Sequence, residues 1–137
     1  MSLESARQSI VAAVEAAKTG FVAYPLVINY DNRMLVDPQT QTNPYLDVEI
    51  FYMSGEQADL SANPRHRVWG QLHLQAVVKE GQGRAKADAL LDYFYPQLHR
   101  KTFGGVRTFM SSIAPVKFKN GLAFYPVLIP FMFDTIY

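Results

Sequence analysis

The residue types that most often carry chemistry are few in this chain of 137 amino acids. Its three histidines are His66, His73 and His99, and no His-x-x-x-His pair or carboxylate-rich box accompanies them. His66 and His73 are seven positions apart, an odd spacing that places them on opposite faces of a regular strand, where they cannot hold one metal ion. Cysteine is absent, which excludes disulfide bonds, thiol nucleophiles and cysteine-ligated zinc. The sequence therefore predicts no metal centre and no cofactor.

Two further patterns have suitable residue types but incomplete spacing. Gly81-Gln82-Gly83 follows an expected strand and opens an expected helix, as a phosphate-binding loop does, yet the third glycine of the dinucleotide fingerprint is missing. No Gly-x-Ser-x-Gly elbow is present to anchor a hydrolase triad. Asp47 and Glu49 share one strand face and could form an acid–base pair. On an outward face we expect them to be solvated or paired with Arg67 or Lys79, so we expect no enzyme.

The composition predicts a soluble protein with a single domain over residues 1–137. Apolar residues make up 49% and charged residues 18% of the chain, against about 25% charged in an average protein. This excludes disorder for most of the chain and suggests that part of the surface is covered by a partner. The net charge of +1 provides no field that would gather nucleic acid or an anionic membrane. No signal peptide is visible, and the longest apolar run, residues 122–133, is too short for a membrane span of about 20 residues.

The charges are unevenly divided along the chain. Residues 1–82 carry 6 basic and 9 acidic side chains, whereas residues 83–137 carry 7 basic and 3 acidic ones. The division is either a trivial result of sequence order or the sign of one acidic and one basic face. Two such faces would suit head-to-tail contacts between copies of the chain.

Apolar periodicity predicts two amphipathic helices. Residues 3–21 place apolar side chains at steps of three and four, with Ser2 as the N-cap and Gly20 at the end. The second helix follows Gly83, and its apolar stripe consists of Ala87, Leu90 or Leu91, Phe94 and Leu98. Pro96 should kink this helix or end its regular part.

The rest of the chain is typical of an antiparallel sheet. We expect strands in residues 25–30, 45–53 and 67–80, followed by a hairpin of residues 106–118 and 122–133 around an Asn-Gly turn. The two prolines of the last strand have the same parity and remove donors from one side only, which predicts an edge strand. Residues 54–65 read as a mobile loop without structure of its own. The predicted fold is α+β, with a largely antiparallel sheet of four to five strands and two helices packed on it.

This order of elements resembles the tail terminator proteins of long, non-contractile-tailed phages of the lambda-like type and related prophage proteins. The likeness covers nearly the whole chain. Its core is Arg67-Val68-Trp69-Gly70-Gln71-Leu72, then Gly81-Gln82-Gly83, then Ala87-Asp88-Ala89-Leu90-Leu91-Asp92-Tyr93-Phe94. The opening helix, Ile28-Asn29-Tyr30-Asp31-Asn32, Tyr45-Leu46-Asp47-Val48 and the closing Phe133-Asp134 fit the same pattern.

The resemblance implies a structural virion protein. Members of that family form a hexameric ring that caps the finished tail tube, halts its polymerisation and presents the surface that docks onto the head connector; they are not enzymes. The implied partners are copies of the chain itself, the tail tube protein and the head connector protein. The implied location is the virion tail, after assembly in the cytoplasm of a bacterial host.

The family's function resides in surfaces, so the candidate contact residues come from outward parity and loop position in this chain. Tyr45, Phe51 and Trp69 all belong to strand faces expected to point outward, where three aromatic side chains would form a patch suited to burial in an interface. The candidate subunit and partner interface consists of Tyr45, Asp47, Glu49, Phe51, Arg67 and Trp69 on strands, with Glu56, Asp59, Arg65, Lys117 and Lys119 at loop tips.

Two alternatives remain open at this point. The chain could be another head–tail joining or minor tail protein, which its docking partner would reveal. It could also be a small-molecule binding domain or an enzyme with a pocket between helices and sheet. A buried, polar-lined cavity would favour that second alternative, and a filled apolar core would count against it.

Overall fold

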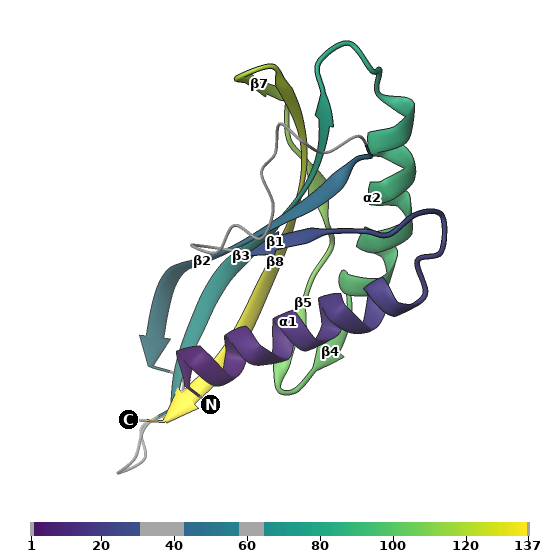
Figure 1. The fold of residues 1–137 in the computed structure, drawn as a ribbon. Coiled ribbons are helices and arrows are strands. Elements are labelled where there is room, and N and C mark those ends of the chain that lie inside the picture. Colours follow the sequence, from purple (N-terminus) through teal and green to yellow (C-terminus); the bar gives the residue numbers. More distant parts are fainter. Residues whose placement is uncertain (1, 31–42, 58–64, 137) are drawn as a thin grey trace.

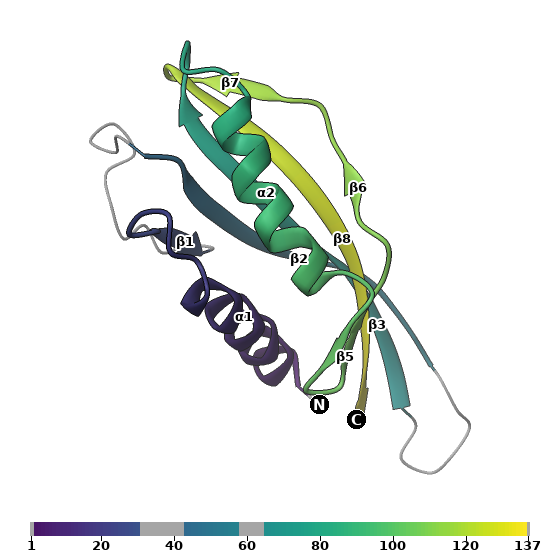
Figure 2. The ribbon, with the colours of Figure 1, turned by 90° about the vertical axis from the view of Figure 1, so that its right-hand side faces the viewer.

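The computed structural model of the chain describes residues 2–30, 43–57 and 65–136. Two helices and a curled mixed sheet form one α+β unit (Figure 1), with both helices on the same side of the sheet (Figure 2). The expected α+β class is therefore confirmed. The sheet is larger than expected, because eight strands belong to it within the described residues, several of them only two or three residues long.

Helix α1 (Leu3–Thr19) begins and ends where the sequence predicts. Ser2 is its N-cap, and the Ser5 backbone N–H donates to the Ser2 hydroxyl over 3.0 Å. Gly20 is its C-cap. The side chains that it buries are Ala6, Ile10, Val14 and Ala17, which lie three or four residues apart.

Helix α2 (Ala85–Leu98) buries the predicted stripe of Ala87, Leu90, Leu91, Phe94 and Leu98. Pro96 lies in the last turn, and the helix ends two residues later at Leu98. The two helices meet through Tyr93 of α2, whose hydroxyl donates to the Ala17 carbonyl oxygen over 2.6 Å.

The strands are β1 (Ile28–Tyr30), β2 (Tyr45–Gln57), β3 (Arg65–Lys79), β4 (Thr102–Phe103), β5 (Val106–Thr108), β6 (Ser112–Ile113), β7 (Lys117–Lys119) and β8 (Leu122–Ile136). Their order is β1-β2-β3-β8-β5-β4, and β6 and β7 also pair with β8. All pairs are antiparallel except β1 with β2, so the sheet is mixed.

The prediction that the last strand lies at an edge is wrong. Strand β8 is central, because it pairs along its whole length with β3 and on its other side with β5, β6 and β7. The two prolines still explain how β8 pairs on that second side. On that side, the carbonyl oxygens of Pro126 and Pro130 accept from the backbone N–H groups of Ala114 and Phe109. The backbone nitrogen of a strand residue points to the same side as its carbonyl, so this is also the side on which the two prolines have no N–H to donate. The neighbour of β8 is accordingly broken into three short strands instead of one long one.

The loop predicted for residues 54–65 is shorter than expected. Strand β2 continues to Gln57 and β3 begins at Arg65, because the antiparallel pairing persists beyond a register shift between Tyr52 and Ser54. The remaining residues, 58–64, lie outside the described part of the chain. The predicted Asn-Gly hairpin is confirmed, since Asn120 and Gly121 join β7 to β8 with φ angles of 52° and 75°.

The core lies between the helices and one face of the sheet. On β3 this face consists of Val68, Leu72, Leu74, Ala76 and Val78, and on β8 of Ala123, Val127, Ile129, Phe131 and Phe133. Gly70 belongs to the same face, and a Cβ atom there would overlap the Phe51 carbonyl oxygen and the Phe131 ring. The absence of a side chain at Gly70 lets Phe131 lie flat against β3.

Candidate interaction surface

The opposite face of the sheet carries most of the predicted interface residues. No helix of the described chain packs on it, and we call it the open face. The alternation of β2, β3 and β8 assigns to it Tyr45, Asp47, Glu49, Phe51, Arg67, Trp69, Gln71, His73, Gln75, Val77, Leu122, Phe124, Pro126, Leu128, Pro130, Met132 and Asp134. Tyr45, Phe51 and Trp69 share this face, as the alternation predicts, but the expected patch of three outward aromatic side chains does not form, because Tyr45 is buried.

Trp69 is half-buried because a neighbouring aromatic ring covers it. The Phe109 ring stacks on the indole with their centres 5.7 Å apart. The Arg107 guanidinium in turn lies 5.3 Å from the centre of the Phe109 ring. These three side chains form a layered group that offers flat apolar area together with one positive charge, a combination enriched in protein interfaces. Sequence reasoning missed Phe109 in this role, although it has the same parity as Arg107.

One of the expected alternatives was an ion pair between Arg67 and Asp47 or Glu49, and the structure does not form it. The Arg67 Nε atom lies 3.2 Å from the Asp134 carboxylate on the adjacent strand β8. The pairing of β3 with β8 places Arg67 directly opposite Asp134, whereas Asp47 and Glu49 lie opposite Gln75 and His73. Both members of the Arg67–Asp134 pair are partly shielded from water, with side chains 36% and 27% exposed.

Tyr45 lies on the open face but is not accessible, since only 4% of it is exposed. It packs in a small second cluster with Val77 and Leu122, which closes this end of the open face. Burial, together with the negative charge of Asp47, raises the pKa of Tyr45 to about 12. Tyr45 therefore stabilises the face on which Asp47 and Glu49 lie and offers a partner little area of its own.

Phe51 is the exposed aromatic side chain of the open face, with 44% of its surface accessible. Its ring centre is 4.5 Å from that of His73, which forms a hydrogen bond of 3.1 Å with Gln71 Oε1. Met53, next to the register shift of β2, is 64% exposed. Phe51 and Met53 thus give this part of β2 two accessible large apolar side chains, which a partner could cover.

The loop-tip candidates divide into two groups. Lys117 and Lys119 are exposed on β7 beside the Asn-Gly turn. Glu56 and Arg65 lie near the far ends of β2 and β3, and their side chains are outside the described part, as is the whole of Asp59. The structure thus places the two lysines far across the sheet from β2, on the other side of the β3–β8 pair.

Within the described residues no group of three or more His, Asp or Glu side chains could hold a metal ion. His73 lies on the open face, and His66 has the opposite parity on β3. His99 ends α2, where its Nδ1 atom accepts from the Ser111 backbone N–H over 3.3 Å. In the same part of the chain, no buried side-chain polar atom lacks a hydrogen-bond partner.

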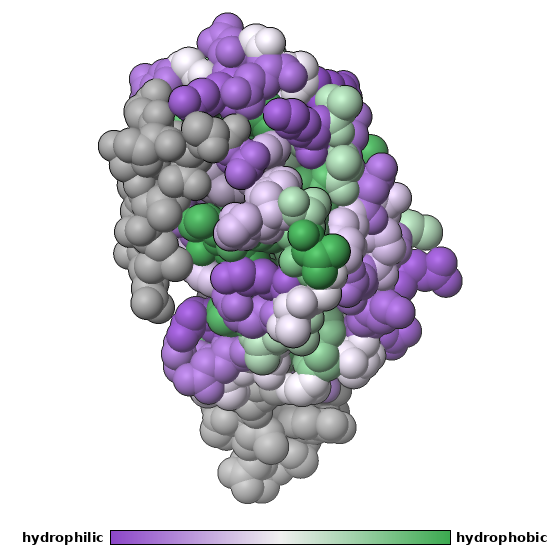
Figure 3. Space-filling view, turned by 45° about the vertical axis from the view of Figure 1, so that its right-hand side comes forward, coloured by the Kyte–Doolittle hydropathy of each residue, from purple (hydrophilic) through white to green (hydrophobic). Residues whose placement is uncertain are grey.

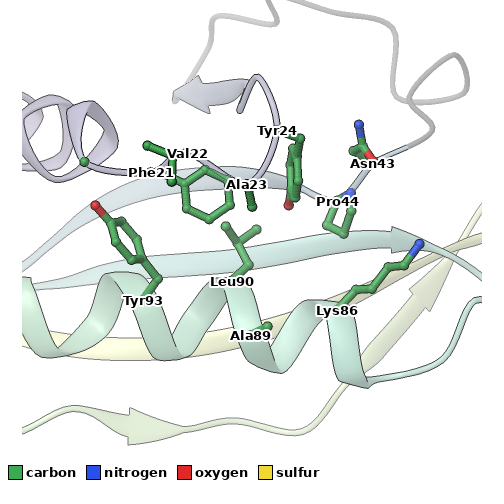
Figure 4. A pocket seen from close by; sticks show the side chains of 11 residues that line it. Phe21, Val22, Ala23, Tyr24, Asn43, Pro44, Lys86, Ala89, Leu90 and Tyr93 are labelled. Carbon is green, nitrogen blue, oxygen red and sulfur yellow. The ribbon is translucent and has the colours of Figure 1, made fainter.

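A pocket of about 440 Å³ opens on the helix side, between the segment that follows α1 and the first turns of α2 (Figure 4). The described residues that line it are mostly apolar and aromatic, and Lys86 is the one charged side chain among them. The Phe21 ring stands edge-on between Tyr24 and Tyr93, at 5.0 and 5.2 Å between centres. A space-filling view of this side shows hydrophobic side chains gathered in the middle and ringed by hydrophilic ones (Figure 3). The pocket is open and apolar, so it is not the buried, polar-lined cavity that would favour an enzyme.

No helix in the described residues is long and apolar enough to cross a membrane. Comparison with known proteins finds no protein-family model and no curated protein that matches this chain. A solved structure with no functional name has a similar fold, with a TM-score of 0.70, 15% sequence identity and coverage of 100% of this chain and 98% of the other. At this identity the likeness concerns the fold alone. It defines the chain as an α+β protein whose curled sheet has helices on one face.

Proposed function

We propose that the chain is a structural protein that caps a phage tail tube as a ring, ends the polymerisation of the tube and presents the surface on which the head connector docks. The observation that carries the proposal is the open face: a sheet with a filled core on one side presents aromatic, apolar and charged side chains on the other. The resemblance to tail terminators supplies the particular assembly. Tube protein, head connector and other copies of the chain are the proposed partners, and the virion tail is the proposed location.

The geometry supports a role in assembly more than a role in catalysis. Phe51, Met53 and the group of Trp69, Phe109 and Arg107 would gain burial from a protein partner, at about 25 cal/mol for each Å² removed from water. The work of such a protein is geometric, because one side of the ring must complement the last layer of the tube and the other must offer no site for a further layer. Another head–tail joining protein would use the same surface with a different partner.

Tube capping tests the proposal directly. The tail tube protein encoded with this chain is polymerised with and without it, and tube lengths are measured by negative-stain electron microscopy. We expect short tubes with one closed end, and rings of about six subunits in the solution mass of the free protein or at the tube ends. Tubes that grow to the same length in both samples would contradict the proposal.

Two variants connect the open face to that activity. Trp69→Ala removes the ring that stacks on Phe109, and Arg67→Glu places two like charges beside each other at Asp134. We expect both to weaken capping, whereas Lys18→Glu on α1 makes the same change in net charge away from the open face and should cap normally. Normal capping by both open-face variants would remove this surface from the proposal.

A further inference from the structure

We infer that copies of this chain join head to tail through the two opposite sides of the sheet, the β2 side of one copy meeting the β5–β7 side of the next. The inference rests on the proposed function and names the surfaces that would build its ring. We call the two surfaces the acidic side, made of Asp47, Glu49, Phe51 and Met53, and the basic side, made of Arg107, Ile113, Lys117, Phe118 and Lys119.

The charges of the two sides are cleanly separated in the sequence. Residues 34–64, which include β2, carry five acidic side chains and no basic one. Residues 93–133, which include β4 to β7 and most of β8, carry five basic side chains and no acidic one. Among the described residues, the fold places β2, with Asp47 and Glu49, and β5 to β7, with Arg107, Lys117 and Lys119, on opposite sides of the central β3–β8 pair. The division of charge along the chain thus becomes a division in space.

The separation is too wide for the charges to neutralise one another within one copy. Along one row of the sheet, Glu49 lies opposite His73, His73 opposite Leu128, and Leu128 opposite Ser112 of β6. Three strand spacings separate the ends of this row, about 14 Å at the usual distance between paired strands. That exceeds the screening length of about 8 Å at physiological ionic strength. A second copy can bring an acidic side and a basic side into direct contact, which one copy cannot do.

Exposed apolar side chains at both sides also favour a contact between copies. On the acidic side, Phe51 is 44% and Met53 64% exposed, and on the basic side, Ile113 is 78% and Phe118 61% exposed. On the basic side, Ile113 and Phe118 lie opposite Val127 and Ala123 of the helix-side face, whereas Arg107, Lys117 and Lys119 lie opposite residues of the open face. This side of the sheet therefore offers apolar area on one face and positive charge on the other, and a copy that covers it would contact both. Two acidic sides or two basic sides would repel each other, which disfavours a symmetric dimer through either side. Contacts between unlike surfaces repeat from copy to copy and close into a ring when the rotation allows.

Charge exchange between variants tests this contact. Variant A carries Asp47→Lys and Glu49→Lys, and variant B carries Lys117→Glu and Lys119→Glu. Either variant alone has two sides of like sign, so we expect its self-association to be weaker than that of the unchanged protein by about tenfold or more. An equimolar mixture restores unlike sides in alternating copies and should associate again. Light scattering over a range of concentrations measures all three, and thermal unfolding checks that each variant is folded.

Cross-linking gives a second measurement that does not depend on charge reversal. The chain contains no cysteine, so Glu49→Cys and Lys117→Cys each introduce a single thiol, and a short bis-maleimide joins thiols that lie close together. Each single variant should stay uncrosslinked, their mixture should give covalent dimers, and a chain with both substitutions should give a ladder of oligomers. Asp92→Cys mixed with Lys117→Cys is the matched control, since Asp92 is an exposed residue of α2.

The outcomes separate this inference from the proposed function. Oligomers without the mixed cross-link, dimers of one single variant with itself, or a mixture of A and B that stays dissociated would each overturn the head-to-tail contact. A protein that stays monomeric and uncrosslinked at all concentrations would overturn it as well. Tube capping is measured independently, so a capping protein that fails these tests keeps the proposed function and loses only this arrangement.

Discussion

The two faces of the same strands differ in what holds their side chains in place. On the helix side of β3, Leu72, Leu74 and Ala76 are 0% exposed and contact both neighbouring strands and helices. One residue earlier in each case, the open face carries Gln71, His73 and Gln75, which are half-buried.

This difference separates the residues that fold the protein from those available to a partner. The helix side already has its full burial, so a substitution there changes the free energy of unfolding. The open face retains accessible apolar area and charge, so a substitution there should change association more than stability. The predictions below test this division.

The largest effect is expected at Phe131. Its side chain is 0% exposed and lies between Phe133, Tyr52 and the bare backbone of Gly70. We expect Phe131→Ala to lower the free energy of unfolding by about 3–5 kcal/mol, since it leaves a cavity in the core. Phe51→Ala is the matched change on the open face and should cost about 1 kcal/mol or less. If urea unfolding showed equal losses of unfolding free energy for Phe131→Ala and Phe51→Ala, the two faces would not differ in their contribution to stability.

Gly70→Ala tests the same division with a single methyl group. The added Cβ would overlap the Phe51 carbonyl oxygen and the Phe131 ring, and we expect a loss of about 1–3 kcal/mol from overpacking. Gln71→Ala, one position away on the open face, should change stability by about 0.5 kcal/mol. Similar denaturation midpoints for both variants would show that Phe131 and the β2 backbone at Phe51 move aside without cost.

Tyr45 sharpens the comparison, because it is an open-face residue that is buried like the core. Its pKa is raised from 10.0 to about 12 in the folded protein, so the folded state retains the phenolic proton longer than the unfolded state. The resulting stability is fully present below pH 10 and is lost as the pH rises from 10 to 12. We expect the unchanged protein to lose about 1 kcal/mol more than Tyr45→Phe over this range, after allowance for solvent screening. Parallel pH curves for the two proteins would contradict the burial of Tyr45.

The smallest effects are expected at two ion pairs that differ in location. The Nε atom of Arg84, the N-cap of α2, lies 3.2 Å from the Asp88 carboxylate, with side chains 62% and 49% exposed. Arg84→Ala should cost less than about 0.5 kcal/mol. Arg67 pairs with Asp134 at the same distance but is better shielded within the sheet, and Arg67→Ala should cost about 1 kcal/mol. High salt should reduce the Arg84 effect more than the Arg67 effect. The reverse order would mean that the open face contributes less to stability than the helix surface.

Much of the fold could be predicted because local patterns decide which way a side chain points. The steps of three and four in α1, the alternation in β3 and the Asn120-Gly121 turn depend only on near neighbours in the chain. The shared face of Tyr45, Phe51 and Trp69 follows from the same alternation. The sign of the charge in each segment is also a property of the sequence.

The errors arose where segments distant in sequence meet. Pro126 and Pro130 indicated a side with missing donors, but only the pairing of β8 with three short strands reveals that this side lies inside the sheet. Parity placed Tyr45 outward, but the contact with Val77 and Leu122 buries it. Pairing with an acid of β2 was one of the alternatives for Arg67, and the register of β3 with β8 places Asp134 nearer.

The sequence by itself determined the helices, the strand faces and the separation of acidic from basic segments, because each depends on residue type and local periodicity. Only the tertiary structure decided which strand is central, which aromatic side chains are covered, and that the acidic strand β2 and the basic strands β5 and β7 lie on opposite sides of the β3–β8 pair. These features depend on which distant segments pair, and that choice is made by the burial of the whole core and by no short stretch of the chain.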